Sequence, residues 1–145
     1  MVLSSWFVVR SSLLVVMERI NKVLKITKFE DIKAWKEARV LVGLVYDVIK
    51  KPTFKMDYAL VEQIRRASIS VMANIAEGFD SISNIEFVKF LTYSQRSCSE
   101  VQSHLYVALD QEYVDQVRFE QMYAKCSEVK NLIGGFIKYL KRCAL

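Results

Sequence analysis

The chain contains 145 residues, of which 52% are hydrophobic and 26% charged, so it suits a single domain with a substantial buried core. Its one proline and four glycines are too few for an all-β protein, which needs many turn residues, and they favour an all-α domain. The net charge of +5 does not describe that domain, because residues 1–28 carry +4 of it and residues 29–145 only +1.

The first sixteen residues, MVLSSWFVVRSSLLVV, are apolar enough to resemble a signal or an anchor, but they fit neither pattern. Arg10 interrupts the run, which is shorter than the roughly 20 apolar residues of a membrane helix. A secretory signal carries its basic charge before the apolar core, whereas here the basic residues follow it. We expect residues 1–26 to form an N-terminal extension, poorly structured or helical. We interpret residues 1–16 as translated sequence upstream of a true start at Met17; a peripheral membrane anchor is the alternative.

The first helix is predicted from about Phe29 to Lys51. Thr27 and Glu30 have the spacing of a capping box, in which each side chain accepts a hydrogen bond from a backbone N–H at the helix start. Pro52 cannot continue the helix easily. Apolar residues recur at helical spacing, and they predict one buried stripe: Ile32, Trp35, Ala38 or Arg39, Val42, Val45 or Tyr46, and Ile49.

The second helix is predicted from about Tyr58 to Glu77, with Asp57 as its N-cap and Gly78 as its C-terminal stop. At about 100° per residue it carries two apolar surfaces. A helix in an isolated bundle needs only one buried stripe, and exposed apolar patches tend to mark interfaces. The first surface predicts the core and comprises Leu60, Ile64, Ala67 or Ser68, Val71 and Ile75. The second predicts a contact with another subunit and comprises Ile69, Met72, Ala73 and Ala76.

Polar residues flank this second surface. Arg66, Ser70, Asn74 and Glu77 share a third side of the same helix, and Arg65 lies next to Arg66. The two arginines form either a solvated rim or hydrogen bonds to a neighbouring subunit. Under the second interpretation the oligomer interface comprises Arg65, Arg66, Ile69, Met72, Ala73, Asn74, Ala76 and Glu77.

Two further helices complete the domain. Ser83 and Glu86 repeat the capping-box spacing and open a third helix that reaches about Gln111. The stretch DQEYVDQ at 110–116 is a turn, and Asp115 caps a fourth helix that ends near Lys141. Four long helices with short connections predict that residues 27–145 form an antiparallel, up-down-up-down four-helix bundle. In EFVKFLTY at 86–93 we interpret Phe87, Phe90 or Leu91, and Ser94 just after it, as core; the alternative is base stacking beside lysines.

The sequence shows no pattern of catalytic or metal-binding residues. His104 is the only histidine, so the paired Glu-x-x-His motifs of a di-iron bundle are not present. Cys98 lies near it in sequence, but a thiol nucleophile needs a specific setting, and no glycine-rich phosphate loop occurs. The three cysteines form no C-x-x-C pair, which favours reduced thiols in the cytoplasm. We expect no enzyme activity, metal, cofactor or small-molecule substrate.

Three motifs together resemble a known family: FEDIKAWKEARVL at 29–41, QIRRASISVMANIAEGF at 63–79 and SNIEFVKFL at 83–91. Over about residues 27–141 the chain looks like the four-helix-bundle proteins encoded by intervening sequences in bacterial 23S rRNA genes. The resemblance implies an antiparallel four-helix bundle that assembles into a barrel-like homopentamer. A related branch serves as the accessory protein of diversity-generating retroelements, which implies a basic surface and a reverse-transcriptase partner. Here Met72 stands where the family usually has proline, and DSIS at 80–83 replaces its usual glycine and basic residues.

Two functional hypotheses follow. The first is a non-enzymatic, homo-oligomeric assembly module, supported by the second apolar surface and by the resemblance. The alternative is a nucleic-acid-binding accessory protein that acts on RNA or DNA, with a reverse transcriptase or a structured RNA as partner. The residues expected to contact nucleic acid in that case are Arg65, Arg66, Lys89, Arg96, Lys138, Lys141 and Arg142.

Overall fold

The computed structural model describes residues 26–143. The expectations about the extension, including the start at Met17 and the membrane anchor, therefore lie outside the described residues. Within residues 26–143 all regular secondary structure is helical and no strand occurs. The elements in chain order are the 3₁₀ helix η1 (Phe29–Asp31), α2 (Lys33–Ile49), the 3₁₀ helix η2 (Phe54–Met56), α3 (Tyr58–Phe79), α4 (Asn84–Asp110) and α5 (Gln116–Cys143).

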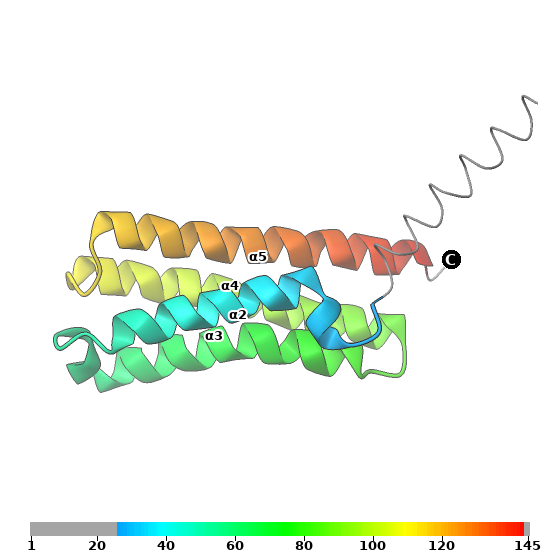
Figure 1. Ribbon diagram of the computed structural model, residues 1–145, viewed down its shortest axis with the longest axis horizontal. Helices are drawn as coiled ribbons and strands as arrows, with labels where there is room; N and C mark the ends of the chain where they lie inside the picture. Colours follow the sequence, from blue (N-terminus) through cyan, green and yellow to red (C-terminus); the bar gives the residue numbers. More distant parts are fainter. Residues whose placement is uncertain (1–25, 144–145) are drawn as a thin grey trace, which may run out of the picture.

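The four α-helices lie side by side as a bundle, and each short connection reverses the chain (Figure 1). Helix α3 packs against α2 and α4, and α5 packs against α4 and α2, so every helix contacts the helices next to it in a closed square. This arrangement confirms the predicted all-α, up-down-up-down bundle.

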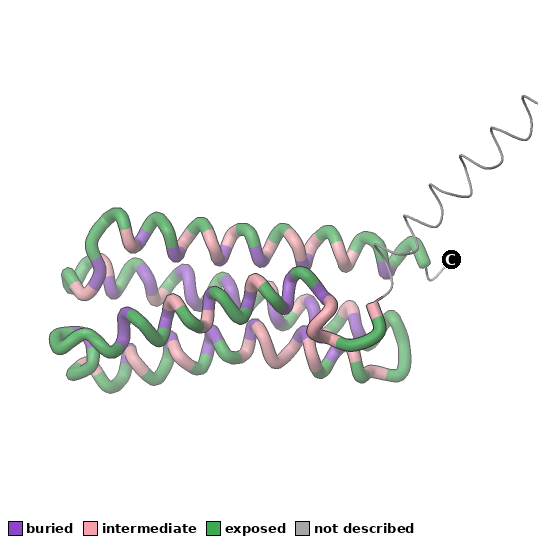
Figure 2. Tube along the Cα trace, in the orientation of Figure 1, coloured by how far each residue is buried: buried purple, intermediate pink, exposed green. Residues whose placement is uncertain are grey.

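The core runs along the whole bundle axis as two clusters, and buried residues line the inner side of each helix (Figure 2). On α3 the predicted stripe is confirmed, since all six residues named for it are buried. On α2 the choice between paired candidates is decided: Ala38 and Val45 face the core, whereas Arg39 and Tyr46 are exposed. Val42 is only half-buried, and Leu41 fills the core beside it.

Three predicted N-caps are confirmed. Asp57 Oδ1, Ser83 Oγ and Asp115 Oδ1 each accept a hydrogen bond from the backbone N–H three residues later, at 3.1, 3.2 and 2.7 Å. Each bond satisfies one of the N–H groups that the first turn of a helix leaves without a partner. The second half of the Ser83 box differs slightly, because Glu86 Oε2 accepts from the N–H of Ile82 at 3.4 Å.

The start of the first helix was predicted incorrectly. Asp31, and not Glu30, accepts the hydrogen bonds from Thr27: the backbone N–H and the hydroxyl both lie 3.0 Å from Asp31 Oδ2. The chain then forms the short helix η1, and α2 begins only at Lys33. The N-cap of η1 is Lys28 and not Thr27, so the acidic partner three residues later is Asp31, which also accepts a hydrogen bond from the backbone N–H of Lys28 at 3.2 Å.

Gly78 does not stop the second helix as predicted, because α3 continues through it to Phe79. The glycine is needed for packing between α3 and α4. A Cβ atom at this position would lie 2.6 Å from Phe87 Cδ2 and 2.9 Å from Phe90 Cβ, well inside van der Waals contact. Its role is the close approach of two helices, and not a turn.

Polar side chains on α4 bind both neighbouring helices inside the bundle. Ser94 Oγ donates to the carbonyl oxygen of Val71 on α3 at 2.6 Å. On the other side, Gln95 Nε2 donates to the carbonyl of Lys130 on α5 at 3.0 Å, and Gln102 Nε2 lies 3.0 Å from Ser127 Oγ. These bonds satisfy polar atoms of Ser94, Gln95 and Gln102, which would destabilise the bundle if they lost water without gaining a partner.

The packing at Gly78 predicts opposite effects for two glycine substitutions in helices. Gly78→Ala should lower the free energy of unfolding by about 1–3 kcal/mol, because the new methyl group overpacks the contact with Phe87. The matched control is Gly135→Ala in α5, where a Cβ would meet nothing within 4 Å. That variant should gain up to about 1 kcal/mol from helix propensity. Urea unfolding measures both, and equal effects would contradict the packing role of Gly78.

Candidate assembly and nucleic-acid interface

The second apolar surface of α3 divides into two parts in the structure. Met72 and Ala76 pack, half-buried, against the core cluster of the same chain. Ile69 faces outward with 42% of its surface exposed, and Ala73 lies half-buried one turn later. The outward apolar patch of α3 is therefore smaller than the sequence predicted and is centred on Ile69 and Ala73.

The two arginines differ in their surroundings. Arg66 is exposed, and its Nη1 lies 3.6 Å from Glu62 Oε1 one turn earlier. Such an exposed pair contributes about 0.2–0.5 kcal/mol to helix stability. This is too little to make the stability of the bundle depend on Arg66. Arg65 is half-buried, and both side chains lie within one turn of Ile69.

Asn74 takes part in the seam between α3 and α4. Its Nδ2 donates to the carbonyl oxygen of Ser70 at 2.8 Å and lies 3.0 Å from Ser70 Oγ. That hydroxyl is 2.9 Å from Ser97 Oγ on α4, so a polar chain crosses from one helix to the other. Glu77, the last member of the predicted interface, is exposed one turn after Ala73.

Helix α4 presents an aromatic side chain between two cations, in the stretch 86–93 for which base stacking was the alternative to core, but the sequence did not single out Tyr93. Tyr93 is 37% exposed, and Lys89 Nζ and Arg96 Cζ lie 6.0 and 5.9 Å from its ring centroid. Both cations were proposed as nucleic-acid contacts, but the tyrosine was not. The spacing Lys-x-x-x-Tyr-x-x-Arg, which places all three on one side of a helix, was the available signal. The core interpretation of the surrounding stretch is correct for Phe87, Leu91 and Ser94, which are buried.

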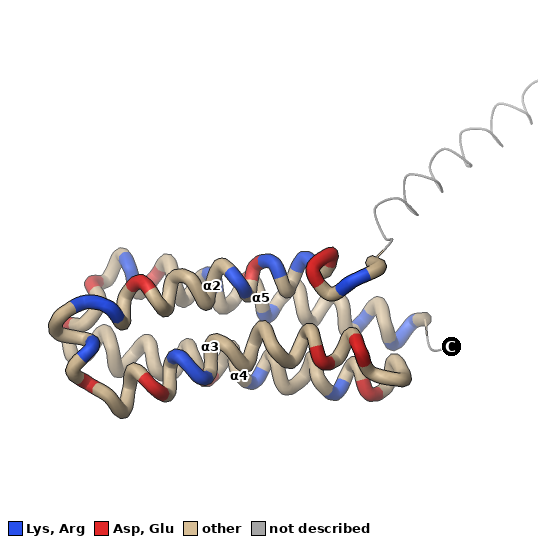
Figure 3. The backbone as a smooth tube through the Cα atoms, turned by 60° about the horizontal axis from the view of Figure 1, so that its bottom comes forward, with Lys and Arg blue, Asp and Glu red and all other residues tan. Residues whose placement is uncertain are grey.

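The residues proposed to bind nucleic acid lie in three separate places within one subunit. Arg65 and Arg66 are near the middle of α3, Lys89 and Arg96 are on α4, and the rest are exposed at the end of α5. The thirteen residues of α3 that follow Arg66 span about 20 Å. Figure 3 shows blue segments scattered over the bundle, with red ones between them. The basic residues at the end of α5 are Lys138, Lys141 and Arg142.

No group in the described residues is arranged as an activated nucleophile. Cys98 and Cys126 are buried in the core, and their burial raises the pKa of each thiol to about 12. A neutral thiol is a poor nucleophile and a poor metal ligand. His104 Nε2 lies 3.6 Å from Glu100 Oε1, and the histidine side chain is partly exposed. Within residues 26–143 no three His, Cys, Asp or Glu side chains come together as a metal-ligand set.

The family match decides how this fold is classified. A model of the 23S rRNA-intervening sequence protein family matches residues 30–135, which is most of the bundle. The chain belongs to this family. Within the matched range lie α3 and α4, which carry the outward patch and Tyr93. No curated protein matches the chain.

A solved structure of a protein from the S23 ribosomal protein family has a similar fold. It is a protein of unknown function from Bacteroides thetaiotaomicron, with a TM-score of 0.62 and 23% sequence identity to this family member. The match covers 73% of this chain and 95% of that chain. At this identity the likeness concerns the fold alone. Among the helices of the described residues, none is both long enough and apolar enough to cross a membrane.

The burial of two of the three thiols predicts their reactivity. In the folded protein only the exposed Cys143 should react with a thiol reagent at pH 8, because the other two thiols are neutral and inaccessible. All three should react after unfolding in guanidinium chloride. A chromogenic disulfide reagent counts the reactive thiols, and Cys143→Ser is the matched control that should remove the fast phase. Fast reaction of a second thiol in the folded protein would contradict the buried setting.

Proposed function

We propose that this protein is a non-enzymatic, homo-oligomeric assembly module of the cytoplasm. The observation that carries the proposal is Ile69, a large aliphatic side chain that stays 42% exposed on a helix whose core stripe is already buried. Ala73 lies beside it one turn along α3. Two small or aliphatic residues at this spacing let the backbone of another helix approach closely, and exposed apolar surface of this kind marks a contact.

The polar residues around this patch suit the edge of a contact between subunits. Arg65 and Arg66 lie on one side along the helix and Glu77 on the other, so their charged ends remain near water while their stems cover the rim. In a closed cyclic oligomer the patch of every subunit is buried against a neighbour, so that no copy leaves it exposed. The number of five subunits comes from the family resemblance.

A charge placed in the patch should reduce the size of the particle. Ala73→Arg should give smaller particles than the unchanged protein, because the guanidinium loses water in the contact without gaining a partner. The matched control is Ala59→Arg, which introduces the same change at an exposed position in the first turn of α3 and should leave the size unchanged. Light scattering coupled to gel filtration measures the mass. A monomeric unchanged protein at micromolar concentration would refute the assembly.

A second function is favoured by the setting of Tyr93. Its ring lies between Lys89 and Arg96. Proteins that bind single-stranded nucleic acid combine aromatic rings, on which bases stack, with cations that contact the phosphates. In a ring of subunits this group repeats, so modest local charges add up although residues 29–145 carry only +1. We therefore propose, as the alternative, an accessory protein that binds RNA or DNA together with a reverse transcriptase or a structured RNA. A reverse-transcriptase gene with a template repeat beside this gene would favour it.

Nucleic-acid binding should be measurable at low salt and largely vanish near physiological salt. Log affinity should fall with log salt concentration by about 0.7 per phosphate neutralised on single strands and about 0.9 on duplex DNA. Tyr93→Ala should weaken single-strand binding by about 1–3 kcal/mol per stacked base. Tyr46→Ala is the matched control, since that tyrosine is equally exposed, at 37% for both.

The basic N-terminal extension needs a separate control in this assay. Fluorescence anisotropy should compare the whole protein with a chain that begins at Thr27 and lacks most of the positive charge. If the shorter chain retains neither RNA nor DNA at low salt, the bundle is not a nucleic-acid module and the assembly function stands alone.

A further inference from the structure

The outward face of α2 carries an apolar surface that the other described helices leave open. Val40 is 48% exposed, and it lines a pocket of about 360 Å³ together with Trp35, Lys36 and Arg39. Gly43 is exposed one turn further along this face, and a Cβ atom there would meet nothing within 4 Å. An exposed glycine in the middle of a helix destabilises the helix relative to alanine. The free space above Gly43 therefore favours the close approach of a second helix.

The outward patch of α3 lies at the same height along the bundle as this face of α2. Ile69 stands at the boundary between the two core clusters, and Val40 stands at the same boundary on α2. A rotation about an axis parallel to the bundle leaves heights unchanged, so Ile69 of one copy comes level with the pocket beside Val40 of the next. The cluster members that mark this boundary are Ala67 and Val71 on α3 and Ala38 and Leu41 on α2.

The charges along the two faces are complementary, because α2 and α3 run in opposite directions. Near its start α2 carries Lys33 and Lys36, and neither forms an ion pair with another described residue. The half of α3 at this level carries Glu77, which is exposed and equally unpaired. Towards its other end α2 carries Asp47, whose side chain is 66% exposed, and the matching half of α3 carries Arg66. Opposite charges therefore meet in both halves of an antiparallel contact.

We propose that the outward patch of α3 docks on the outward face of α2 in a second copy of the chain. Ile69 enters the pocket beside Val40, and Gly43 lets the two helices approach closely. The inference rests on the assembly function proposed above and names the surface that receives the patch. Helices α2 and α3 occupy adjacent corners of the bundle, so their outward faces point in different directions. A contact between two different faces is heterologous, and its repetition by rotation closes a ring.

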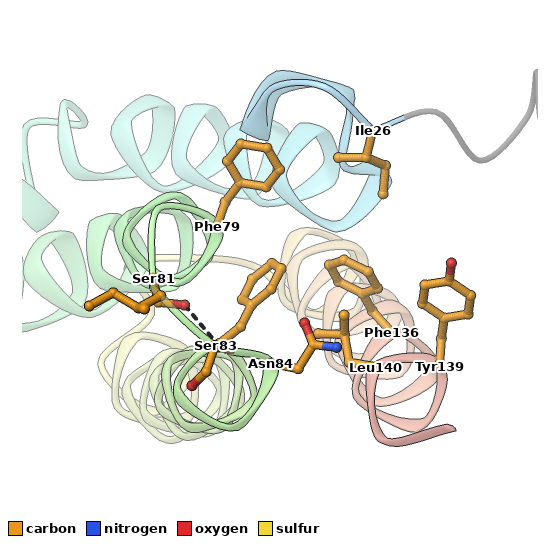
Figure 4. Close-up of a pocket in the computed structure, with 10 residues that line it drawn as sticks. Ile26, Phe79, Ser81, Ser83, Asn84, Phe136, Tyr139 and Leu140 are labelled. Atoms are coloured by element: carbon orange, nitrogen blue, oxygen red, sulfur yellow. Dashed lines mark hydrogen bonds between the residues drawn. The ribbon is translucent and has the colours of Figure 1, made fainter. Parts of the chain in front are cut away.

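The end of α3 sets the limit of this contact. Beyond Glu77 the chain turns its aromatic side chains towards the end of its own bundle, where Phe79 and Phe87 lie with ring centroids 6.4 Å apart. Figure 4 shows Phe79 and Phe136 on two sides of the pocket of about 350 Å³ that the chain forms there. These rings serve contacts within one subunit, so the surface offered to a neighbour ends at Glu77.

Disulfide formation between copies tests the contact. Two kinds of full-length chain, both with Cys143→Ser, are co-expressed and oxidised with copper phenanthroline: one carries Lys36→Cys and the other Ala73→Cys. A disulfide should join the two kinds of chain, because both positions lie beside the second core cluster on faces that meet. In the matched control Asn131→Cys, at an exposed position of α5, replaces Lys36→Cys and should give no such disulfide. Peptide mass spectrometry identifies the joined chains.

The outcomes separate this contact from the assembly itself. If the oligomer forms and only Ala73→Cys chains join one another, α3 docks on α3 and the receiving face on α2 is overturned. No disulfide in an intact oligomer, or one that joins Ala73→Cys to Asn131→Cys chains, overturns it in the same way. If light scattering finds the unchanged protein monomeric at micromolar concentration, the assembly function is refuted and this contact is refuted with it.

A larger side chain at Gly43 tests the close approach. Gly43→Leu should reduce the particle to the mass of one chain, because the new side chain fills the space that the second helix needs. The helix content measured by circular dichroism should not fall, since leucine forms helices better than glycine. The matched control is Gly135→Leu in α5, where a Cβ would also meet nothing within 4 Å, and it should keep the full mass. A Gly43→Leu particle of unchanged mass would overturn the docking on α2.

Discussion

Burial of the apolar stripe of α3 is the constraint on which the other features depend. Ile64, Val71 and Ile75 are fully buried between the neighbouring helices, which fixes the rotation of α3 about its own axis. With that rotation fixed, Ile69 and Ala73 must lie on the outward side, and Asn74 must lie at the seam with α4. The same constraint places Gly78 against Phe87, so the end of the helix and the start of the next share one contact.

Those features of the fold that depend on local chemistry could be predicted from the sequence. The caps at Asp57, Ser83 and Asp115 were predictable because a side-chain oxygen and an N–H three residues later suffice for each. Gly78 was misread because its function depends on Phe87 and Phe90 of another helix, which no local pattern of α3 contains. The capping box at Thr27 failed although the signal is local, because the chain begins with the 3₁₀ helix η1 and the cap lies one residue later, at Lys28.

The candidate site was only partly predictable for a related physical reason. A helical wheel shows that α3 carries more apolar surface than one buried stripe. It does not show how much of that surface the neighbouring elements cover. In the structure α3 contacts α4, α2 and η1; Met72 and Ala76 pack against the core cluster, and Ile69 remains outside. Tyr93 was missed because an aromatic residue among core positions is usually core, and only the packed bundle shows which side it faces.

The hydrogen bonds of α4 have a consequence for the bundle as a building block. A purely apolar seam tolerates sliding by one helical turn, about 5.4 Å, because one aliphatic side chain replaces another. Here such a slide would separate Ser94 from Val71 and Gln102 from Ser127, at a cost of about 1–3 kcal/mol for each buried group left unsatisfied. A single axial register is therefore selected, and every copy of the chain presents its outer residues at the same height. Identical subunits with this property would close the proposed ring without adjusting their interiors, because the axial alignment of the four helices is already set within each subunit.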